Sequence, residues 1–237
     1  MKQRLYKIVP KPLRSFVRSL RNRFTSEFAR ASFSQEGEDM ILARIFEGEA
    51  SGFYVDVGAH HPKRFSNTYI FHLAGWSGIN IDAMPGSMKA FNKLRKNDVN
   101  IECGVSDMMG DIPYYIFNET ALNGFDKELA EQRDSKFPQY RIVKTVLVPV
   151  LTLEAILDKN MTPDRQIDFL SIDVEGFDLQ VLRSNNWQKY RPKIVLVEIL
   201  KSNFVDFEDD PIVKFMLDKN YVFVAKTVNT AFFRAEH

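Results

Sequence analysis

The stretch Phe53-Tyr-Val-Asp-Val-Gly-Ala-His-His-Pro62 decides the fold that this sequence predicts. Its first five residues are apolar or aromatic around one acid, Asp56, as in a strand buried on both faces of a parallel sheet. Gly58 and Ala59 end the run in a turn. Ligands of open α/β sheets bind at the carboxyl ends of strands, where a glycine lets the backbone approach a ligand closely. We therefore expect a nucleotide-like ligand here, although an ordinary turn is the competing interpretation.

Segments typical of strands and helices alternate along most of the chain. Strands are expected at residues 53–57, 78–82, 99–104, 167–173 and 193–198, with a closing antiparallel pair at 221–225 and 231–234. Helical segments are expected near residues 41–46, 67–73, 87–96, 177–183 and 211–220. This order predicts an α/β fold with a doubly wound, mostly parallel seven-stranded sheet and right-handed crossovers. A length of 237 residues suits one such domain, which we place at residues 33–237.

An insertion at residues 107–150 interrupts the alternation between the third and fourth strands. It holds two further strand patterns, at 112–117 and 142–150, separated by a polar segment. So long an insertion is a candidate lid or acceptor-recognition element. Its aromatic residues could stack on a sugar or fill a small core: Tyr114, Tyr115, Phe117, Phe125, Phe137 and Tyr140.

The first 32 residues form a separate basic segment with a helical pattern. Nine of the 32 Lys and Arg residues lie within residues 1–30, with only one of the 31 acids, so the remaining chain has a net negative charge. Its apolar residues recur at helical spacing opposite a row of arginines, which predicts an amphipathic helix. Such a helix could lie on an anionic membrane surface, or it could pack on the domain or on a second subunit of a homo-oligomer.

Composition narrows the class of protein. The chain is 45% hydrophobic and 27% charged, as in soluble globular proteins. Cys103 is the only cysteine, so no intrachain disulfide can form and a cytoplasmic protein is expected, with this side chain buried. No run is long enough to span a membrane, and the basic start lacks the apolar core of a secretory signal. An acidic body also argues against nucleic acid as the substrate.

Polar residues stand at the carboxyl ends of four expected strands. They are Asp56 with Gly58, Asp82, Ser106 with Asp107, and Asp173 with Glu175. In an open α/β sheet these ends face one crevice. Asp82 follows Gly58 by about two dozen residues, near the spacing at which an acid accepts hydrogen bonds from ribose hydroxyls.

The turn after the first strand does not suit a dinucleotide. A pyrophosphate usually needs three spaced glycines for close backbone approach. Here His60, His61 and Pro62 occupy the positions after Ala59. The crowding disfavours a nicotinamide oxidoreductase and is compatible with a nucleoside ligand that carries no phosphate, of which S-adenosylmethionine is the obvious example.

The ordered motifs of the chain resemble those of FkbM-family methyltransferases. The similarity runs from about residue 33 to residue 200, and its most diagnostic part is the last of these segments: Ser34-Gln35-x-Gly37-Glu38-Asp39, Val55-Asp-Val-Gly-Ala-His60, Ile81-Asp82, Val105-Ser-Asp107 and Ile167-Asp-Phe-Leu-Ser-Ile-Asp-Val-Glu-Gly176. Many members have Asn-Ile-Gly or a similar sequence where this chain has His60-His61-Pro62. The resemblance implies a class I methyltransferase fold of the Rossmann-like type, S-adenosylmethionine as cofactor, and methyl transfer to a hydroxyl, often of a sugar.

The resemblance also implies roles for individual residues. Backbone atoms around Gly58 and Ala59 should hold the methionine part of the cofactor, and Asp82 should bind its ribose with Ala83 beside the adenine. Ser106 and Asp107 should border the adenine. Gln35 and Glu38 should reach the rim of the site, and Asp56 is also expected among the cofactor-binding residues.

A hydroxyl acceptor must lose its proton during or after attack, so a base is expected nearby. The candidates are Asp173, Glu175, His60 and His61, and Asp173 is preferred because it ends the central strand. Asp173, Glu175 and Glu198 could instead bind a divalent cation, although no ligand spacing requires one. The acceptor is expected to be a sugar in a glycan, glycolipid or nucleotide sugar. The alternative function is a non-catalytic module that acts through its basic first segment.

Overall fold

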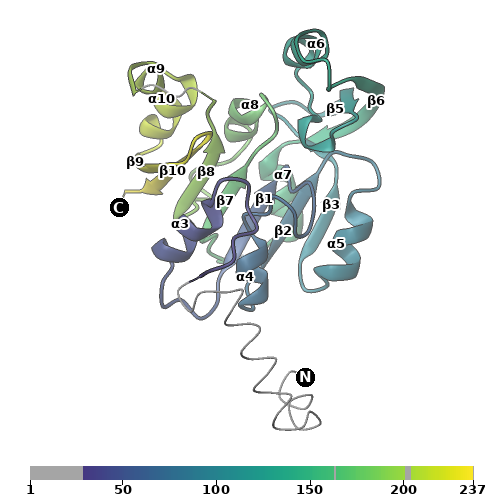
Figure 1. Ribbon diagram of the computed structural model, residues 1–237. Helices are drawn as coiled ribbons and strands as arrows, with labels where there is room; N and C mark the ends of the chain where they lie inside the picture. Colours follow the sequence, from purple (N-terminus) through teal and green to yellow (C-terminus); the bar gives the residue numbers. More distant parts are fainter. Residues whose placement is uncertain (1–28, 163, 201–203, 237) are drawn as a thin grey trace. The chain divides into compact units, whose positions relative to one another are not determined.

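A seven-stranded sheet forms the centre of the protein (Figure 1). The computed structural model describes residues 29–162, 164–200 and 204–236. The strand order across the sheet is β3 (Val99–Glu102), β2 (Ser77–Asp82), β1 (Phe53–Val57), β7 (Phe169–Ile172), β8 (Ile194–Glu198), β10 (Thr230–Ala235) and β9 (Tyr221–Lys226). The first five strands are parallel, and β10 is antiparallel to both neighbours. The predicted α/β fold, including the closing antiparallel pair, is confirmed.

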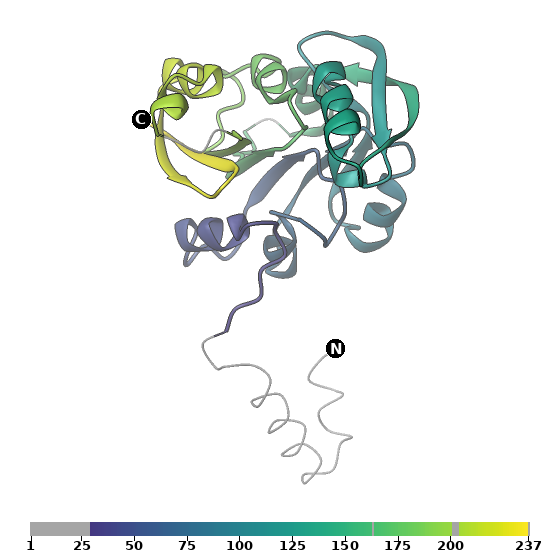
Figure 2. The same cartoon turned by 45° about the horizontal axis from the view of Figure 1, so that its top comes forward.

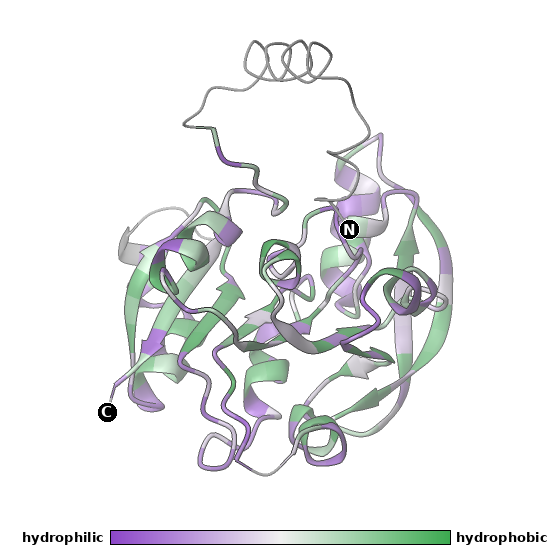
Figure 3. Cartoon of the chain, turned by 90° about the horizontal axis from the view of Figure 1, so that it is seen from below, coloured by the Kyte–Doolittle hydropathy of each residue, from purple (hydrophilic) through white to green (hydrophobic). Residues whose placement is uncertain are grey.

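The two faces of the sheet carry two separate apolar cores, because side chains alternate along each strand. Tyr54 and Phe169 pair across β1 and β7 and belong to one core, whereas their neighbours Val55 and Leu170 belong to the other. Figure 3 shows the strands coloured mainly as hydrophobic and the peripheral loops mainly as hydrophilic. Strands that are apolar on both faces are typical of a buried parallel sheet.

Helices cover both faces (Figure 2). Helices α3 (Glu38–Ile45) and α4 (Tyr69–Leu73) pack against the core that contains Tyr54 and Phe169. Helix α5 (Met88–Leu94) packs nearby on Ala59. The core that contains Val55 and Leu170 is covered by α7 (Leu153–Asn160), α8 (Asp178–Arg183) and α10 (Pro211–Asp218), and α9 (Phe204–Glu208) precedes α10 in the chain. The predicted helices at 67–73, 87–96, 177–183 and 211–220 are therefore present, with shorter bounds. Helix α7 was not among the predictions.

The insertion forms a second, three-stranded sheet of order β4-β6-β5. It consists of β4 (Gly104–Val105), β5 (Gly110–Phe117) and β6 (Ile142–Leu151), together with η1 (Thr120–Leu122) and α6 (Lys127–Lys136). The strand predicted at 99–104 is present as β3 but ends earlier, since the chain leaves the central sheet after Glu102 and Gly104 pairs with Val150 instead. The polar segment between the two predicted strands folds as α6, which has almost no apolar face.

The membrane and oligomer expectations for residues 1–30 fall largely outside the described residues. Phe33–His237 form one compact unit. Among the helices that the structure describes, none has both the length and the apolar character that crossing a membrane requires.

Candidate functional site

A cavity opens at the carboxyl ends of β1, β2 and β7. The strand order reverses between β1 and β7, which is where open α/β sheets bind ligands. The predicted site residues in its lining are Gln35, Gly58, His60, Asp82, Ala83, Asp173 and Glu175. The sequence therefore identified the three strand ends that form the floor of this cavity.

Only glycine fits at position 58, because of the backbone conformation and the neighbouring strand end. Its φ is +83°, and a Cβ placed on it would lie 1.8 Å from the carbonyl oxygen of Asp173. The backbone amide of Asp173 also donates to the carbonyl of Val57 at 3.0 Å. The closest approach at this glycine is thus between the ends of β1 and β7, and Gly58 also lines the cavity. Any side chain here would push the two strand ends apart.

Asp82 ends β2 with its carboxylate held by the backbone. Its Oδ2 accepts from the N–H of His60 at 2.8 Å, and its Oδ1 accepts from the N–H of Met84 at 2.9 Å. Burial raises the pKa of Asp82, and these two hydrogen bonds oppose the rise. Each carboxylate oxygen has a second lone pair, so this fixed group can also accept hydrogen bonds from a ligand.

The two histidines have different positions. His60 has a φ of 51°, lines the cavity and stacks on Phe65, with ring centroids 6.4 Å apart. Burial lowers the pKa of His60. His61 lies outside the cavity lining, and its Nδ1 accepts from the N–H groups of Lys63 and Arg64 at 3.1 and 3.0 Å. His61 therefore stabilises its own turn.

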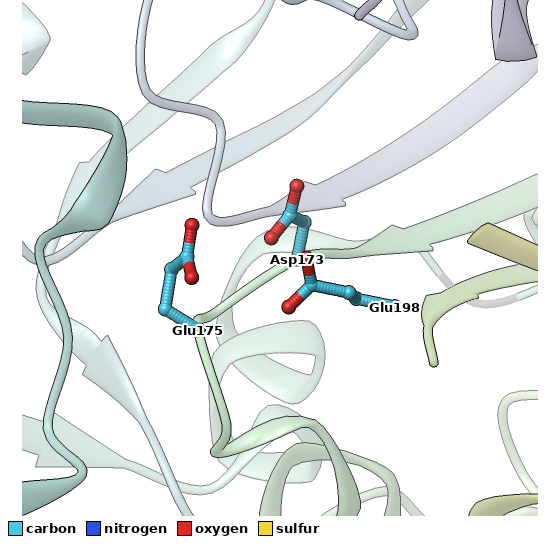
Figure 4. A group of neighbouring side chains, drawn as sticks. All are labelled: Asp173, Glu175 and Glu198. Carbon is cyan, nitrogen blue, oxygen red and sulfur yellow. The ribbon is translucent and has the colours of Figure 1, made fainter. Parts of the chain in front are cut away.

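Asp173, Glu175 and Glu198 converge at the end of β7 and β8 (Figure 4). One carboxylate oxygen from each lies within 4.8 Å of the others. Asp173 is exposed on the cavity, and desolvation by the surrounding protein together with the nearby charge of Glu175 raises its pKa well above the usual range. Burial also raises the pKa values of Glu175 and Glu198. Three neighbouring carboxyl groups with raised pKa values can share protons with one another, and their oxygens could also coordinate a cation.

The insertion contributes the countercharge to this carboxylate cluster. Arg133 of α6 places Nη2 2.5 Å from Oε2 of Glu175, with both side chains about one-seventh exposed (14% and 15%). Glu175 has a φ of 55°, which is uncommon for a residue with a side chain. Gly124 packs closely against Glu175: a Cβ placed on this glycine would lie 3.2 Å from the Cβ and from the carbonyl oxygen of Glu175. The insertion therefore holds Glu175 in place.

Asp178 stabilises the loop of residues 174–176 that carries Glu175. Its two carboxylate oxygens accept from the N–H groups of Val174 and Gly176, at 3.3 and 3.1 Å. Burial raises the pKa of Asp178 to about 7. Asp178, in the first turn of α8, therefore shapes the loop that carries Asp173.

Several predicted site residues lie away from the cavity. Glu38 is buried and accepts from the hydroxyl of Thr230. Ala59 packs among Met88 and Phe91. Glu198 does not line the cavity, but it lies beside Asp173 and Glu175, which do.

Ser106 and Asp107 do not line this cavity either. The Ser106 hydroxyl donates to Asp107 at 3.3 Å, and both residues line a neighbouring cavity. The positions expected for them are taken by Cys103, Gly104 and Val105, which line the first cavity. The chain turns out of the central sheet at this point, which moves the following residues away.

The insertion supplies one wall of the cavity, of which the sequence pointed only to the aromatic residues Tyr114 and Phe125. The residues are Tyr114, Thr120, Ala121, Asn123 and Phe125. Asn123 accepts from the N–H of Phe117 at 2.8 Å, which fixes the turn that carries them. No local signal marks these residues, because their place depends on how the second sheet packs on the first.

Arg95 is a second feature that the sequence did not reveal. It is fully buried at the end of α5, and its guanidinium donates to the carbonyl of Pro62, to Ser66 and to the hydroxyl of Tyr54. It also lies 3.7 Å from Asp98. This residue ties the loop after β1 to the rest of the domain.

Asp56 is buried next to this loop, and its Oδ2 accepts from the hydroxyl of Thr68 at 3.1 Å. Burial raises its pKa to about 6, well above the usual value for an aspartate. Between about pH 4 and pH 6, Asp56 therefore keeps its proton in the folded protein but has lost it in the unfolded chain. This contribution to stability is present at pH 4 and lost above pH 6, with a size of ~3 kcal/mol.

We expect Asp56→Asn to remove this pH dependence. The free energy of unfolding of the native protein, relative to that of the variant, should fall by ~3 kcal/mol between pH 4 and pH 7.5. Urea denaturation at both pH values measures it, and the exposed Asp111→Asn serves as control. Equal changes in the two variants would contradict the assignment to Asp56.

Comparison with known proteins places the chain in a family. A model of the "Methyltransferase FkbM domain" matches residues 56–223. No curated protein matches the sequence significantly. Among solved structures, similarity is found to a proposed RNA methyltransferase from Pyrococcus horikoshii (TM-score 0.45, 11% identity, 85% of this chain and 84% of that chain).

Two further structures are similar at the same level. They are precorrin-6y C5,15-methyltransferase from Geobacter metallireducens (TM-score 0.43, 13% identity, 89% and 95% of the two chains) and a proposed O-methyltransferase from Klebsiella pneumoniae (TM-score 0.44, 9% identity, 97% and 92%). The matched residues include the carboxyl end of β1 and all of β2, β7 and β8. The chain has the α/β fold of class I methyltransferases and belongs to the FkbM methyltransferase family.

Proposed function

We propose that this methyltransferase uses S-adenosylmethionine to methylate a hydroxyl group of a sugar, in a glycan, a glycolipid or a nucleotide sugar. The observation that carries the proposal is that one cavity joins a fixed carboxylate at the end of β2 to an acidic cluster at the end of β7. The first suits a ribose, and the second suits a hydroxyl that must lose a proton.

The lining of the cavity suits a nucleoside cofactor in its chemistry. Asp82 offers free lone pairs to ribose hydroxyls, and Ala83 lines the cavity beside it. Val57, Ile81 and Val105 provide apolar surface in the same lining.

The turn after β1 gives an independent argument against a pyrophosphate. A pyrophosphate site needs several free backbone N–H groups aimed at the ligand. Here the N–H groups of residues 58–61 all donate to protein carbonyls or to the carboxylate of Asp82. None of these four amides is available to a phosphate, which supports a cofactor without one.

The residues around the acceptor position support proton transfer. When bound, S-adenosylmethionine supplies a methyl group activated by its positively charged sulfur. Asp173 lies at the cavity floor, and in its ionised form it can accept the proton of a hydroxyl. Much of the remaining catalysis is the positioning of the two reactants, which needs no further group.

We expect Asp82→Ala to weaken binding of S-adenosylmethionine at least tenfold, because the variant loses both the ribose acceptor and the anchor of the turn at His60. Titration calorimetry of the native protein and the variant measures this. Asp111→Ala, on the exposed start of β5, is the matched control. Absence of binding to the native protein would contradict the proposed function, and equal affinity in all three proteins would contradict the role of Asp82.

A further inference from the structure

A turn held by its own polar side chains leads into α3. Asp39 accepts a hydrogen bond from the hydroxyl of Ser34 at 2.9 Å, which closes the turn on itself. Glu36 and Glu38 accept from residues 229–230 at the start of β10, at 2.7 to 3.3 Å. The turn is therefore fixed in place, both internally and against the end of the sheet.

Gln35 has no such partner among the residues that the structure describes. Its side chain is exposed, and it lines the cavity that also holds Asp173. A glutamine amide carries both a donor and an acceptor, so it can bind the hydroxyls of a ligand in either direction. The fixed turn thus presents a free hydrogen-bonding group to the cavity.

Phe65 presents an aromatic ring to the same cavity. The residue is 38% exposed and belongs to the cavity lining. Its φ of 54° lies in the left-handed region, where a bulky side chain is uncommon and costly. Glycine or asparagine would adopt this conformation more easily, and a polar side chain would be better solvated. An exposed ring at a strained position favours a role in contacting a ligand.

The surrounding residues hold this ring in place. The guanidinium carbon of Arg64 lies 4.2 Å from the centroid of the Phe65 ring. The buried side chain of Arg95 donates to the hydroxyl of Ser66, the next residue, and to the carbonyl of Pro62. A strained residue persists only where its surroundings determine its conformation, and this loop meets that condition.

Gln35 and Phe65 occupy adjoining parts of the lining. The N–H of Ser66 donates to the carbonyl of Phe33 at 2.9 Å, which joins the turn before α3 to the loop after β1. The turn is also held at β10, which lies beyond β7 and β8, whereas the carboxylate proposed for the ribose ends β2 on the other side of β1. A ligand against both residues would still reach Asp173, because all three line one cavity.

The charge of this cavity selects against an anionic acceptor. Its lining contains the acids Asp82, Asp173 and Glu175 and, among the described residues, no lysine or arginine. A phosphate or carboxylate on the entering group would be repelled. An aromatic face and an amide suit an uncharged sugar, since the C–H groups of its ring pack on the aromatic face and its hydroxyls bind the amide.

We propose that Gln35 and Phe65 form the acceptor subsite of this cavity, with the flat face of an uncharged sugar ring against Phe65 and its hydroxyls bonded to the amide of Gln35. This proposal rests on the proposed function, since it names the groups that bind the sugar at the same site. Gln35, which the resemblance places at the rim of the cofactor site, is thereby assigned to the acceptor.

Saturation-transfer NMR tests the proposal on the full chain in the presence of excess S-adenosylhomocysteine, which is expected to fill the cofactor part of the cavity. The probes are the methyl α-glycosides of glucose, galactose, mannose and rhamnose, with methyl α-glucuronide as the anionic counterpart. We expect at least one neutral glycoside to receive saturation from the protein, and the glucuronide to receive less. Absence of transfer to all the neutral glycosides would overturn the proposal, and equal transfer to the glucuronide would overturn its restriction to uncharged sugars.

Substitutions locate the subsite. Phe65→Leu and Gln35→Ala should each weaken binding of the best glycoside about fivefold, while Phe65→Tyr keeps the ring and should keep the affinity. The matched controls are Phe223→Leu and Gln188→Ala: Phe223 is 37% exposed on β9, Gln188 is exposed in the turn between α8 and β8, and neither lines the cavity. Equal changes in the variants and in their controls would overturn the assignment.

Affinity for S-adenosylmethionine separates this proposal from the proposed function. None of these variants should change that affinity, because the groups proposed for the cofactor stay in place. A parallel loss of cofactor affinity in Phe65→Leu and Gln35→Ala would assign both residues to the cofactor and overturn the proposal. If the native protein binds the cofactor but no glycoside, the acceptor subsite is excluded and the cofactor assignment stands. If the native protein does not bind the cofactor, the proposed function fails whatever the glycosides do.

Discussion

Replacing Asp173 with Asn should lower methyl transfer by a factor of about 10²–10⁴ while leaving the affinity for S-adenosylmethionine unchanged. Asn has nearly the same shape as Asp, so the close contact between residue 173 and Gly58 is retained. Its amide cannot take a proton from a hydroxyl. The variant therefore removes the basic group and preserves the floor of the cavity.

The measurement is incorporation of label from methyl-labelled S-adenosylmethionine into acceptors in a cell extract, with cofactor affinity measured in parallel by calorimetry. Asp111→Asn, which changes an exposed acid of the insertion, should retain the native rate. A native rate in Asp173→Asn would exclude Asp173 as the base. A loss of cofactor affinity would instead indicate that the carboxylate contributes to binding.

The strand ends of the candidate site were predictable because they depend on local sequence. An apolar run that stops at an acid or a glycine marks the carboxyl end of a buried strand, whatever lies around it. Gly58, Asp82 and Asp173 were found in this way, and the structure brings all three to one cavity. The fold followed from the same signal, repeated along the chain.

The wall of the site was not predictable, since it depends on how the insertion folds. The pattern at 99–104 continues through Cys103 with no break, yet Gly104 already pairs with Val150 in the second sheet. Helix α6 has few apolar residues, and its one local signal is Asp126, which accepts from the N–H of Leu129 as an N-cap. Tertiary packing therefore placed Arg133, Asn123 and Phe125 at the site.

Buried polar networks are a further class that a single sequence does not reveal. Arg95 follows an exposed face of α5 and reads as a solvated surface charge, which is the usual place for arginine. In the structure its side chain is fully buried, and it accounts for hydrogen bonds to three separate segments of the chain. Such a residue can be recognised only when its partners are known.

Replacing Arg95 with Met should lower the free energy of unfolding by ~3–5 kcal/mol, the usual cost of removing one partner of a buried ion pair. Asp98 would keep its hydrogen bonds to Tyr54 and Asn80 but would lose its nearest arginine while fully buried. The carbonyl of Pro62 would also lose both of the hydrogen bonds that it accepts from this side chain. The midpoint of urea denaturation measures the loss.

Two companion variants make the result informative. Lys93→Met on the exposed face of the same helix removes an equal charge and should change stability by less than about 0.5 kcal/mol. Arg95→Lys keeps the charge without the planar fork and should fall between the two, which gives a measurement even if Arg95→Met does not fold. Similar stability in Arg95→Met and Lys93→Met would show that the network contributes little. A large loss would show that the loop bearing His60 is held in position from behind by a residue that never contacts the cavity.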